Sequence, residues 1–319
     1  MSERNLNEAV VCIPSHRRPD GLQRTLQSLA EQQTGVNFAV VVIDNDAAGR
    51  EAVEVAEAFF AASGIGGLAA VESQQGHCHA VNAAYALALQ HYPEARYFLM
   101  IDDDEAASPG WLDSMVETAK RHGADIVGGP VDRVFEGEVD AATRIHPLFG
   151  SIEAPTGRVP MIHGSGNCLI SRRVFETLDE PQFDLRFNFL GGGDMDFFTR
   201  CRQAGFAFAW CAEAQVIEFV ATDRLSARWL MSRSIRTGTI NYVMDEMRAQ
   251  GLPQRLALAG KNAVSLALSI GRMARLLVTT GHLLPATHPP LMSIGRIMGA
   301  LGIVPTPYKA AAPVAPAEA

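Results

Sequence analysis

The sequence lacks a framework for disulfides or structural zinc. Its five cysteines stand singly and form no Cys-x-x-Cys pair; they are Cys12, Cys78, Cys168, Cys201 and Cys211. Isolated cysteines among apolar neighbours are typical of reduced, buried thiols in a cytosolic protein. The N-terminus also has no charged segment followed by an apolar core and a cleavage site. We therefore expect no secretory signal.

Acidic residues are missing from 247–317, although the whole chain has a net charge of −8. The apolar-rich part of this region, 255–303, is interrupted by Lys261, Arg272, Arg275 and His282. A bilayer-spanning helix needs about 20 mostly apolar residues, which this segment does not supply cleanly. We expect basic helices lying in a membrane interface; a plain helical subdomain or an oligomer contact is the alternative.

The charge asymmetry also predicts how the chain is divided. At 319 residues, with 48% hydrophobic content, the chain can bury one large core and still carry an appendage. We expect a main domain at 1–245, a basic and apolar helical appendage at 246–304 and a disordered Ala/Pro-rich tail at 305–319. The chain is acidic and its basic region has few aromatics, so nothing in the sequence indicates nucleic-acid binding.

Strand and helix patterns alternate through the first half of the chain. The predicted strands are 9–13, 38–43, 68–71 and 97–101, and the predicted helices are 22–29, 50–62, 80–89 and 111–122. This alternation predicts an α/β fold with a mostly parallel sheet and helices on both faces. The polar clusters "PSHRRP", "DND" and "DDDE" follow three of the strands. Since ligands bind at the carboxyl ends of parallel strands, the clusters locate a site.

The most informative of these clusters is the acidic run Asp102-Asp103-Asp104-Glu105. Like charges this close repel one another, and a hard divalent cation such as Mg²⁺ or Mn²⁺ removes that repulsion while also binding substrate phosphates. The alternative is a solvated acidic turn. The run follows a strand with a buried pattern, which favours the cation site.

Four blocks, taken in order, resemble glycosyltransferase family 2 enzymes with the GT-A fold. They are "VVCIPSHRRPDGLQRTLQSLAEQ", "VVVIDND", "IDDDEAASPGWL" and the pair "GSGNCLISRRVFETL" and "GGGDMDFFTRCRQAGF". The resemblance covers residues 8–240. It implies an inverting, metal-dependent enzyme that moves a sugar from a nucleoside-diphosphate sugar to an acceptor hydroxyl.

The resemblance also implies roles for single residues. Asp102 and Asp104 match the metal-binding DxD carboxylates, and Asp103 would line the donor sugar. Asp194 matches the general base, with Asp196 as the fallback and a helix N-cap as the structural alternative. Family members usually have a second acid just before the base, where this chain has Gly193.

The implied donor-nucleotide site draws on several segments. Its residues are Pro14, Ser15, Asp44, Asn45, His77, Asn82, Asp102 and Asp103. Either the Asp44 carboxylate or the Asn45 amide oxygen would accept the N3–H of uracil or thymine, which leaves UDP and dTDP open. His77 would touch phosphate, or it is a surface loop histidine.

The implied acceptor side is less defined, and its candidates are Gly164, Asn167, Asp196, Arg228 and Trp229. Arginines of "DRLSARWLMSRSIRTG" would clamp a diphosphate, or they form the basic face of an amphipathic helix. Arg228-Trp229 resembles the end of the QxxRW segment of processive members, but Leu225 replaces the Gln, which argues against processive synthesis.

The expected function is transfer of a sugar to a saccharide or lipid-linked acceptor in polysaccharide or cell-envelope synthesis, at the cytoplasmic face of the plasma membrane. One alternative is a sugar-phosphate nucleotidyltransferase. Such an enzyme would have a Gly-rich basic loop after the first strand, and "IPSHRRPDG" matches that pattern poorly. Another is a non-catalytic relative that binds nucleotide or membrane, which the intact Asp102, Asp104 and Asp194 disfavour.

Overall fold

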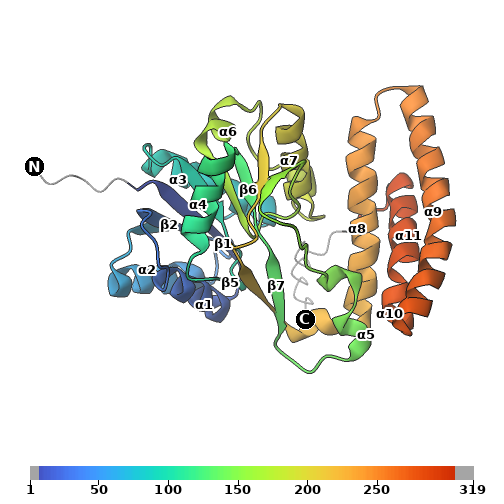
Figure 1. The fold of residues 1–319 in the computed structure, drawn as a ribbon, viewed down its shortest axis with the longest axis horizontal. Helices are drawn as coiled ribbons and strands as arrows, with labels where there is room; N and C mark the ends of the chain where they lie inside the picture. Colours follow the sequence, from blue (N-terminus) through green and yellow to red (C-terminus); the bar gives the residue numbers. More distant parts are fainter. Residues whose placement is uncertain (1–6, 306–319) are drawn as a thin grey trace, which may run out of the picture.

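The computed structural model describes residues 7–305, and the predicted tail lies almost wholly outside them. Their centre is an eight-stranded sheet in the order β3-β2-β1-β4-β9-β6-β10-β8 (Figure 1). The first half follows the predicted alternation. It comprises β1 (Ala9–Ser15), α1 (Pro19–Ala30), β2 (Phe38–Asp44), α2 (Glu51–Ser63), β3 (Gly67–Val71), α3 (His77–His91), β4 (Tyr97–Met100) and α4 (Trp111–His122). The α/β fold with a mostly parallel sheet is therefore confirmed.

Helices cover both faces of the sheet because its strands are apolar on both sides. One core packs α1, α2 and α4 against the sheet through residues such as Leu26 and Trp111. The other packs α3, α6 (Arg172–Thr177) and α7 (Gly193–Gln203) through residues such as Ala84 and Phe197. The strands are thus buried on both faces, which leaves the sheet edge at their carboxyl ends for polar groups.

The second half adds antiparallel strands and a small second sheet. The second half contributes four strands to the large sheet: β6 (Ile126–Gly128), β8 (Gly157–Val159), β9 (Cys168–Ser171) and β10 (Phe208–Trp210). Of these, β9 is antiparallel to both β4 and β6. The small sheet has the order β5 (Glu105–Ala107), β11 (Val216–Val220) and β7 (Val131–Phe135). Because β5 begins directly after Asp104, the small sheet fixes the far end of the acidic turn.

Four helices complete the described chain: α8 (Ala227–Arg248), α9 (Leu252–Thr280), α10 (Leu283–Ala286) and α11 (His288–Ala300). Three short turns, α5 (Ala141–Arg144), η1 (Pro147–Phe149) and η2 (Leu185–Phe187), lie in the loops before them, and η3 (Thr222–Leu225) leads into α8. Ile240 and Met244 of α8 join the second core, so α8 attaches the helices to the sheet domain. Residue 245, where the sequence predicts the domain boundary, lies inside α8.

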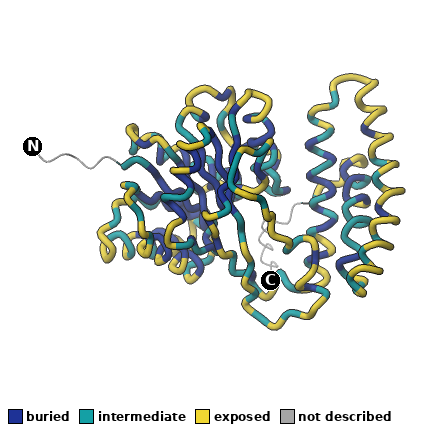
Figure 2. Tube along the Cα trace, viewed as in Figure 1, coloured by how far each residue is buried: buried dark blue, intermediate teal, exposed yellow. Residues whose placement is uncertain are grey.

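The α9 helix lies on the side of α8 and α11 that faces away from the sheet (Figure 1). Most of its residues are exposed (Figure 2). Among residues 7–305 it alone is long and apolar enough to cross a membrane, with a mean hydropathy of 1.3 in its best window and 6% of that window buried. The interrupted apolar runs of the sequence do not predict this.

Candidate active site

The polar clusters meet at one edge of the sheet, as the sequence predicts. Strand β1 ends with Pro14 and Ser15, and Ser15 is paired in parallel register with Asp44 at the end of β2. The neighbouring β4 ends at Met100, directly before the acidic turn. The carboxyl ends of three adjacent strands therefore present their polar residues side by side.

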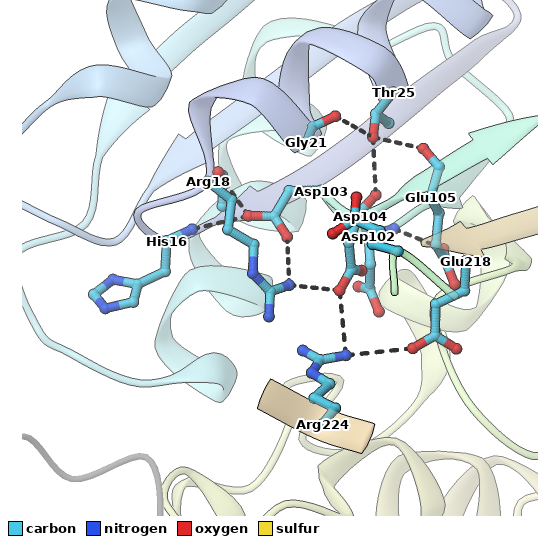
Figure 3. Close-up of polar contacts among 12 residues, drawn as sticks. His16, Arg18, Gly21, Thr25, Asp102, Asp103, Asp104, Glu105, Glu218 and Arg224 are labelled. Atoms are coloured by element: carbon cyan, nitrogen blue, oxygen red, sulfur yellow. Dashed lines mark hydrogen bonds and ion pairs between the residues drawn. The ribbon is translucent and has the colours of Figure 1, made fainter. Parts of the chain in front are cut away.

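Asp103 fixes the acidic turn to the end of β1 (Figure 3). Its buried carboxylate accepts hydrogen bonds from the Ser15 hydroxyl at 2.8 Å, the His16 backbone N–H at 3.1 Å and the Arg18 guanidinium at 3.1 Å. Asp103 and Ser15 therefore hold the acidic turn in place against the end of β1. Their predicted contacts with the donor remain predictions.

The first helix buttresses the same turn. The Thr25 hydroxyl donates to the Glu105 carbonyl at 2.6 Å. A Cβ at Gly21 would lie only 2.5 Å from the Asp103 carbonyl oxygen, so any larger residue there would push α1 away from the turn. The glycine is needed for this close approach, which brings the N-terminal turn of α1 against the carboxylates.

Asp104 lies between two arginines from distant parts of the chain (Figure 3). Its Oδ2 is 2.6 Å from Arg18 Nη1 and 3.3 Å from Arg224 Nη1. The same Arg224 nitrogen is 3.3 Å from Glu218 Oε1, and Arg133 holds the other oxygen of Glu218 at 2.9 Å. The site is thus a network of alternating charges in which both arginines stay partly accessible.

Asp102 is the carboxylate of this turn that no described protein group binds. No hydrogen bond or ion pair to it occurs among residues 7–305; burial, and then Asp104 and Asp103, raise its pKa to about 8. Burial, followed by the charge of Asp102, raises the pKa of Glu105 as well. A Cβ at Gly166 would lie 2.9 Å from Asp102 Oδ2 and 2.8 Å from Glu105 Oε1, so the glycine keeps the space beside both carboxylates open.

These residues fit a hard divalent cation as oxygen donors. Asp102 is desolvated and unpaired, so a cation would relieve the repulsion that raises its pKa. Asp104 would act as a second ligand of the cation only if its carboxylate bound the cation and the arginines at the same time. No ready-made group of three His, Cys, Asp or Glu ligands occurs in the described part of the chain. That arrangement suits Mg²⁺ or Mn²⁺ held by one or two carboxylates together with substrate phosphates.

Asp194 lies in the first turn of α7 and does not cap the helix. The N-cap is Gly192, with φ +92°, and no side chain caps the helix. Asp194 forms no hydrogen bond or ion pair with the residues that the structure describes, which leaves its carboxylate available. Asp196, the fallback, is buried and pairs with Arg200 at 2.8 Å. Of the two candidates, Asp194 is therefore the one with an unpaired carboxylate, and its role as the base stays a prediction.

The glycine before Asp194 has a packing reason. A Cβ at Gly193 would lie 2.9 Å from the Cys78 sulfur and 3.2 Å from Phe183, so an acid could not fit without displacing α3. Close by, burial lowers the pKa of His77 and the Asp194 charge opposes that shift. His77 is therefore a half-buried neighbour of the candidate base, and its contact with phosphate stays a prediction.

Two asparagines predicted in the donor site act as clamps between loops. Asn45 donates to the carbonyls of Glu72 and Gln74 at 3.0 and 2.8 Å and accepts from the Gly76 N–H at 2.7 Å. Asn82 makes a two-way pair with the Phe183 backbone at 2.8 and 2.9 Å. Any contact of Asn45 with a nucleobase would have to use the lone pair that these bonds leave.

The Asp44 carboxylate is also held by the protein itself, and Asn188, which the sequence does not single out, is a third asparagine that links two loops. Both oxygens of buried Asp44 accept backbone N–H groups, from Asp46 and Ala52, at 2.8 Å. Asn188 accepts from the Cys78 N–H at 3.1 Å and donates to the Gln75 carbonyl at 2.9 Å. Nothing in the sequence around Asn188 indicates this contact, because its partners are more than a hundred residues away.

The predicted acceptor residues do not gather into one polar cluster. Asn167 is buried; its amide oxygen accepts from Trp111, and its amide nitrogen donates to the carbonyls of Pro130 and Ala214. Trp229 stacks on Phe149 at 6.5 Å with nearly parallel rings. The remaining candidates are Gly164, which has φ +85°, and Arg228, which is exposed. Arg224 in η3, rather than Arg228, is the arginine of this region that reaches the carboxylates.

The fold is of the GT-A type found in glycosyltransferases. Crystal structures of Staphylococcus aureus TarS share the fold. TarS 1–349 in complex with UDP aligns with a TM-score of 0.53 and 13% identity, covering 92% of each chain. The complex with UDP-GlcNAc aligns with a TM-score of 0.50, also at 13% identity and 92% of each chain.

Sequence comparison narrows the class to a family. The glycosyl transferase family 2 model matches residues 10–179. The succinoglycan biosynthesis protein ExoM of Rhizobium meliloti (strain 1021) is 31% identical over 261 residues, which cover 78% of this chain and 79% of ExoM. The chain therefore belongs to glycosyl transferase family 2 and is a glycosyltransferase, as the resemblance implies. This membership disfavours both alternatives, the nucleotidyltransferase and the non-catalytic relative.

Proposed function

We propose that the protein transfers a sugar, with inversion, from UDP- or dTDP-sugar to a saccharide or lipid-linked acceptor. We place this reaction in polysaccharide or cell-envelope synthesis, at the cytoplasmic face of the plasma membrane. The similarity to ExoM, a succinoglycan biosynthesis protein, supports that context. The UDP and UDP-GlcNAc complexes of TarS support a uridine nucleotide as the donor.

One observation carries the proposal. Asp102 and Asp194 are the two predicted catalytic carboxylates that no described protein group binds. Burial, and then charges that include Asp102 and Asp194, raise the pKa of the Cys168 thiol at the start of β9. A protein tolerates unpaired carboxylates at such a site when a ligand completes it.

The arginines supply the donor-binding chemistry. Arg18 and Arg224 already hold an anion, the Asp104 carboxylate. A guanidinium binds phosphate oxygens with the same geometry as carboxylate oxygens, so a diphosphate would be held by the same two groups. A bound Mg²⁺ or Mn²⁺ at Asp102 would add charge stabilisation of the leaving diphosphate.

Asp194 supplies the proton chemistry. A single displacement at the anomeric carbon needs one base, which takes the proton of the attacking acceptor hydroxyl. Asp194 lies on the first turn of α7 and forms no ion pair with a described residue, so its carboxylate is available beside the positive end of the helix. Inversion follows because the acceptor attacks the face opposite the diphosphate.

The test is substitution of the base. Asp194→Asn is expected to lower the release of UDP from a panel of UDP-hexoses with short-chain glycolipid acceptors by about 10²- to 10⁴-fold. Its affinity for UDP should stay within about twofold, because the base contributes to chemistry more than to donor binding. Asp179→Asn, at an exposed acid, is the matched control. Wild-type turnover by Asp194→Asn would show that the base is assigned wrongly.

A further inference from the structure

The inner stripe of α9 is unusually polar. The positions of this helix that face its neighbours recur every three or four residues and include Leu258, Asn262, Ser265, Ser269, Met273 and Leu276. Half of these side chains are polar. A helix that folds in water buries an apolar stripe and exposes its polar residues, so this stripe has the wrong composition for a helix surrounded by water.

Small residues and side-chain hydrogen bonds hold this helical unit together. Arg296 donates to the Asn262 side chain at 2.8 Å, and Ser293 to the Ser265 carbonyl at 3.2 Å. Between α8 and α11, a Cβ on Gly295 would lie 1.9 Å from the Ile235 carbonyl oxygen. Close backbone approach with polar links is the way helices pack when their surroundings are apolar.

The outer side of α9 is correspondingly apolar. Exposed residues at helical spacing form a stripe, which consists of Leu252, Leu256, Ala259, Ala263, Leu266 and Ile270. The exposed fractions of Leu256 and Ile270 are 64% and 65%. A contiguous apolar stripe on the surface marks a place where another apolar phase or partner is bound. Figure 2 shows that this helix is exposed along most of its length.

The charges on α9 identify what covers this stripe. Arg255, Arg272 and Arg275 are exposed and form no ion pair with any described residue, and the segment 247–317 has no acid. Two copies of such a surface would repel each other, whereas an anionic bilayer would attract it. The uncharged stretch between Lys261 and Arg272 is about half as long as a bilayer-spanning segment, which favours a helix that lies on the membrane.

We propose that α9 docks the enzyme on an anionic phospholipid bilayer. The apolar stripe enters the boundary between headgroups and acyl chains, and the arginines contact lipid phosphates. This docking surface is separate from the carboxylate edge and does not depend on donor chemistry. Together with the proposed function, it would hold the active site beside a lipid-linked acceptor.

The experiment is co-sedimentation of the full chain with vesicles of phosphatidylcholine, with and without phosphatidylglycerol. We expect binding that requires phosphatidylglycerol and weakens with salt. Leu256→Gln combined with Ile270→Gln, and Arg272→Glu combined with Arg275→Glu, should each reduce partitioning by at least about tenfold. Leu185→Gln and Arg121→Glu change exposed residues of the sheet domain and should bind like the wild type.

Four results would overturn the proposal. The first three are equal binding to both kinds of vesicle, unchanged binding by both α9 variants, and a stable dimer in solution that Ile270→Gln dissociates. Vesicle-bound protein that resists extraction by high salt and alkaline carbonate would show a spanning helix and would also contradict surface docking. Release of UDP with a water-soluble acceptor, measured on the same variants, should be unchanged, so failure of docking and failure of the proposed reaction are distinguishable.

Discussion

The sheet domain and the C-terminal helices pack by opposite rules. In α1, Leu22, Leu26 and Leu29 are buried against the sheet, as expected for a helix in water. In α9, serines and an asparagine face the neighbouring helices while Leu256 and similar residues face outward. The first region is stabilised by removing its own apolar surface from water. The second leaves that surface for something outside the chain.

The two regions also use charge differently. At the sheet edge, carboxylates gather around a space that two arginines and a ligand would neutralise. Among the C-terminal helices, Asp245 is bound by both Lys261 and Arg296 at 2.7 Å, which satisfies its charge internally. Asp245 is thus neutralised within the protein, whereas Asp102 has no such partner among the described residues, as expected for the proposed donor site.

The largest effect is expected where helices touch through glycine. Gly295→Leu would force its side chain into the α8 backbone, and it should lower the free energy of unfolding by about 4 kcal/mol or more, or unfold the helical unit. Gly271→Ala, where no atom lies within 4 Å of the added Cβ, should instead stabilise by roughly 0.5–1 kcal/mol. Urea denaturation followed by circular dichroism measures both. Equal effects would show that the close helix contact does not exist in solution.

The two kinds of packing predict different losses of unfolding free energy when a leucine-sized side chain is removed. Leu26→Ala in the sheet domain should cost about 2–5 kcal/mol of unfolding free energy, because it leaves a cavity in the core. Ile270→Ala on α9 should change it by less than about 0.5 kcal/mol in detergent-free buffer. A large loss from Ile270→Ala would mean that its side chain is buried and that the exposed stripe is wrongly placed.

A smaller effect is expected from two histidines where the helices meet the α5 loop. Burial lowers the pKa of both His146 and His288 to about 4. The unfolded chain keeps pKa values near 6.5 and so binds more protons between pH 4 and 6.5. The free energy of unfolding should therefore fall by about 1–3 kcal/mol as pH drops from 6.5 to 4, and stay level above. His288→Asn should flatten this slope; an unchanged slope would contradict the assignment.

The sequence predicts the first half of the fold well for a physical reason. Apolar runs ended by polar clusters, such as Ala9 to Ile13 before "PSHRRP", are local signals, and the structure confirms them. The position of Asp102 at the sheet edge follows from the same pattern. The free state of Asp194 does not follow, because a capping role for it depends on where the helix begins, and Gly192 takes that position.

The contacts that tertiary structure creates could not be read from the sequence. Arg18 and Arg224 converge on Asp104 from opposite ends of the domain, and no local pattern pairs them. Asn82 and Asn167 appear as ligand-binding residues in the resemblance, yet their side chains are used to hold loops. On α9, the absence of acids is visible in the sequence, but the inward position of its serines requires knowing where α11 lies.

Binding of UDP by calorimetry, with Mn²⁺ and then with a chelator, tests most directly that the acidic turn is the donor site. The wild type should bind UDP more tightly with Mn²⁺, and Asp102→Asn and Asp104→Ala should each remove that metal-dependent gain. Asp179→Asn should leave it intact. UDP binding that is indifferent to both the metal and these two substitutions would contradict the account and show that the carboxylates form only a structural turn.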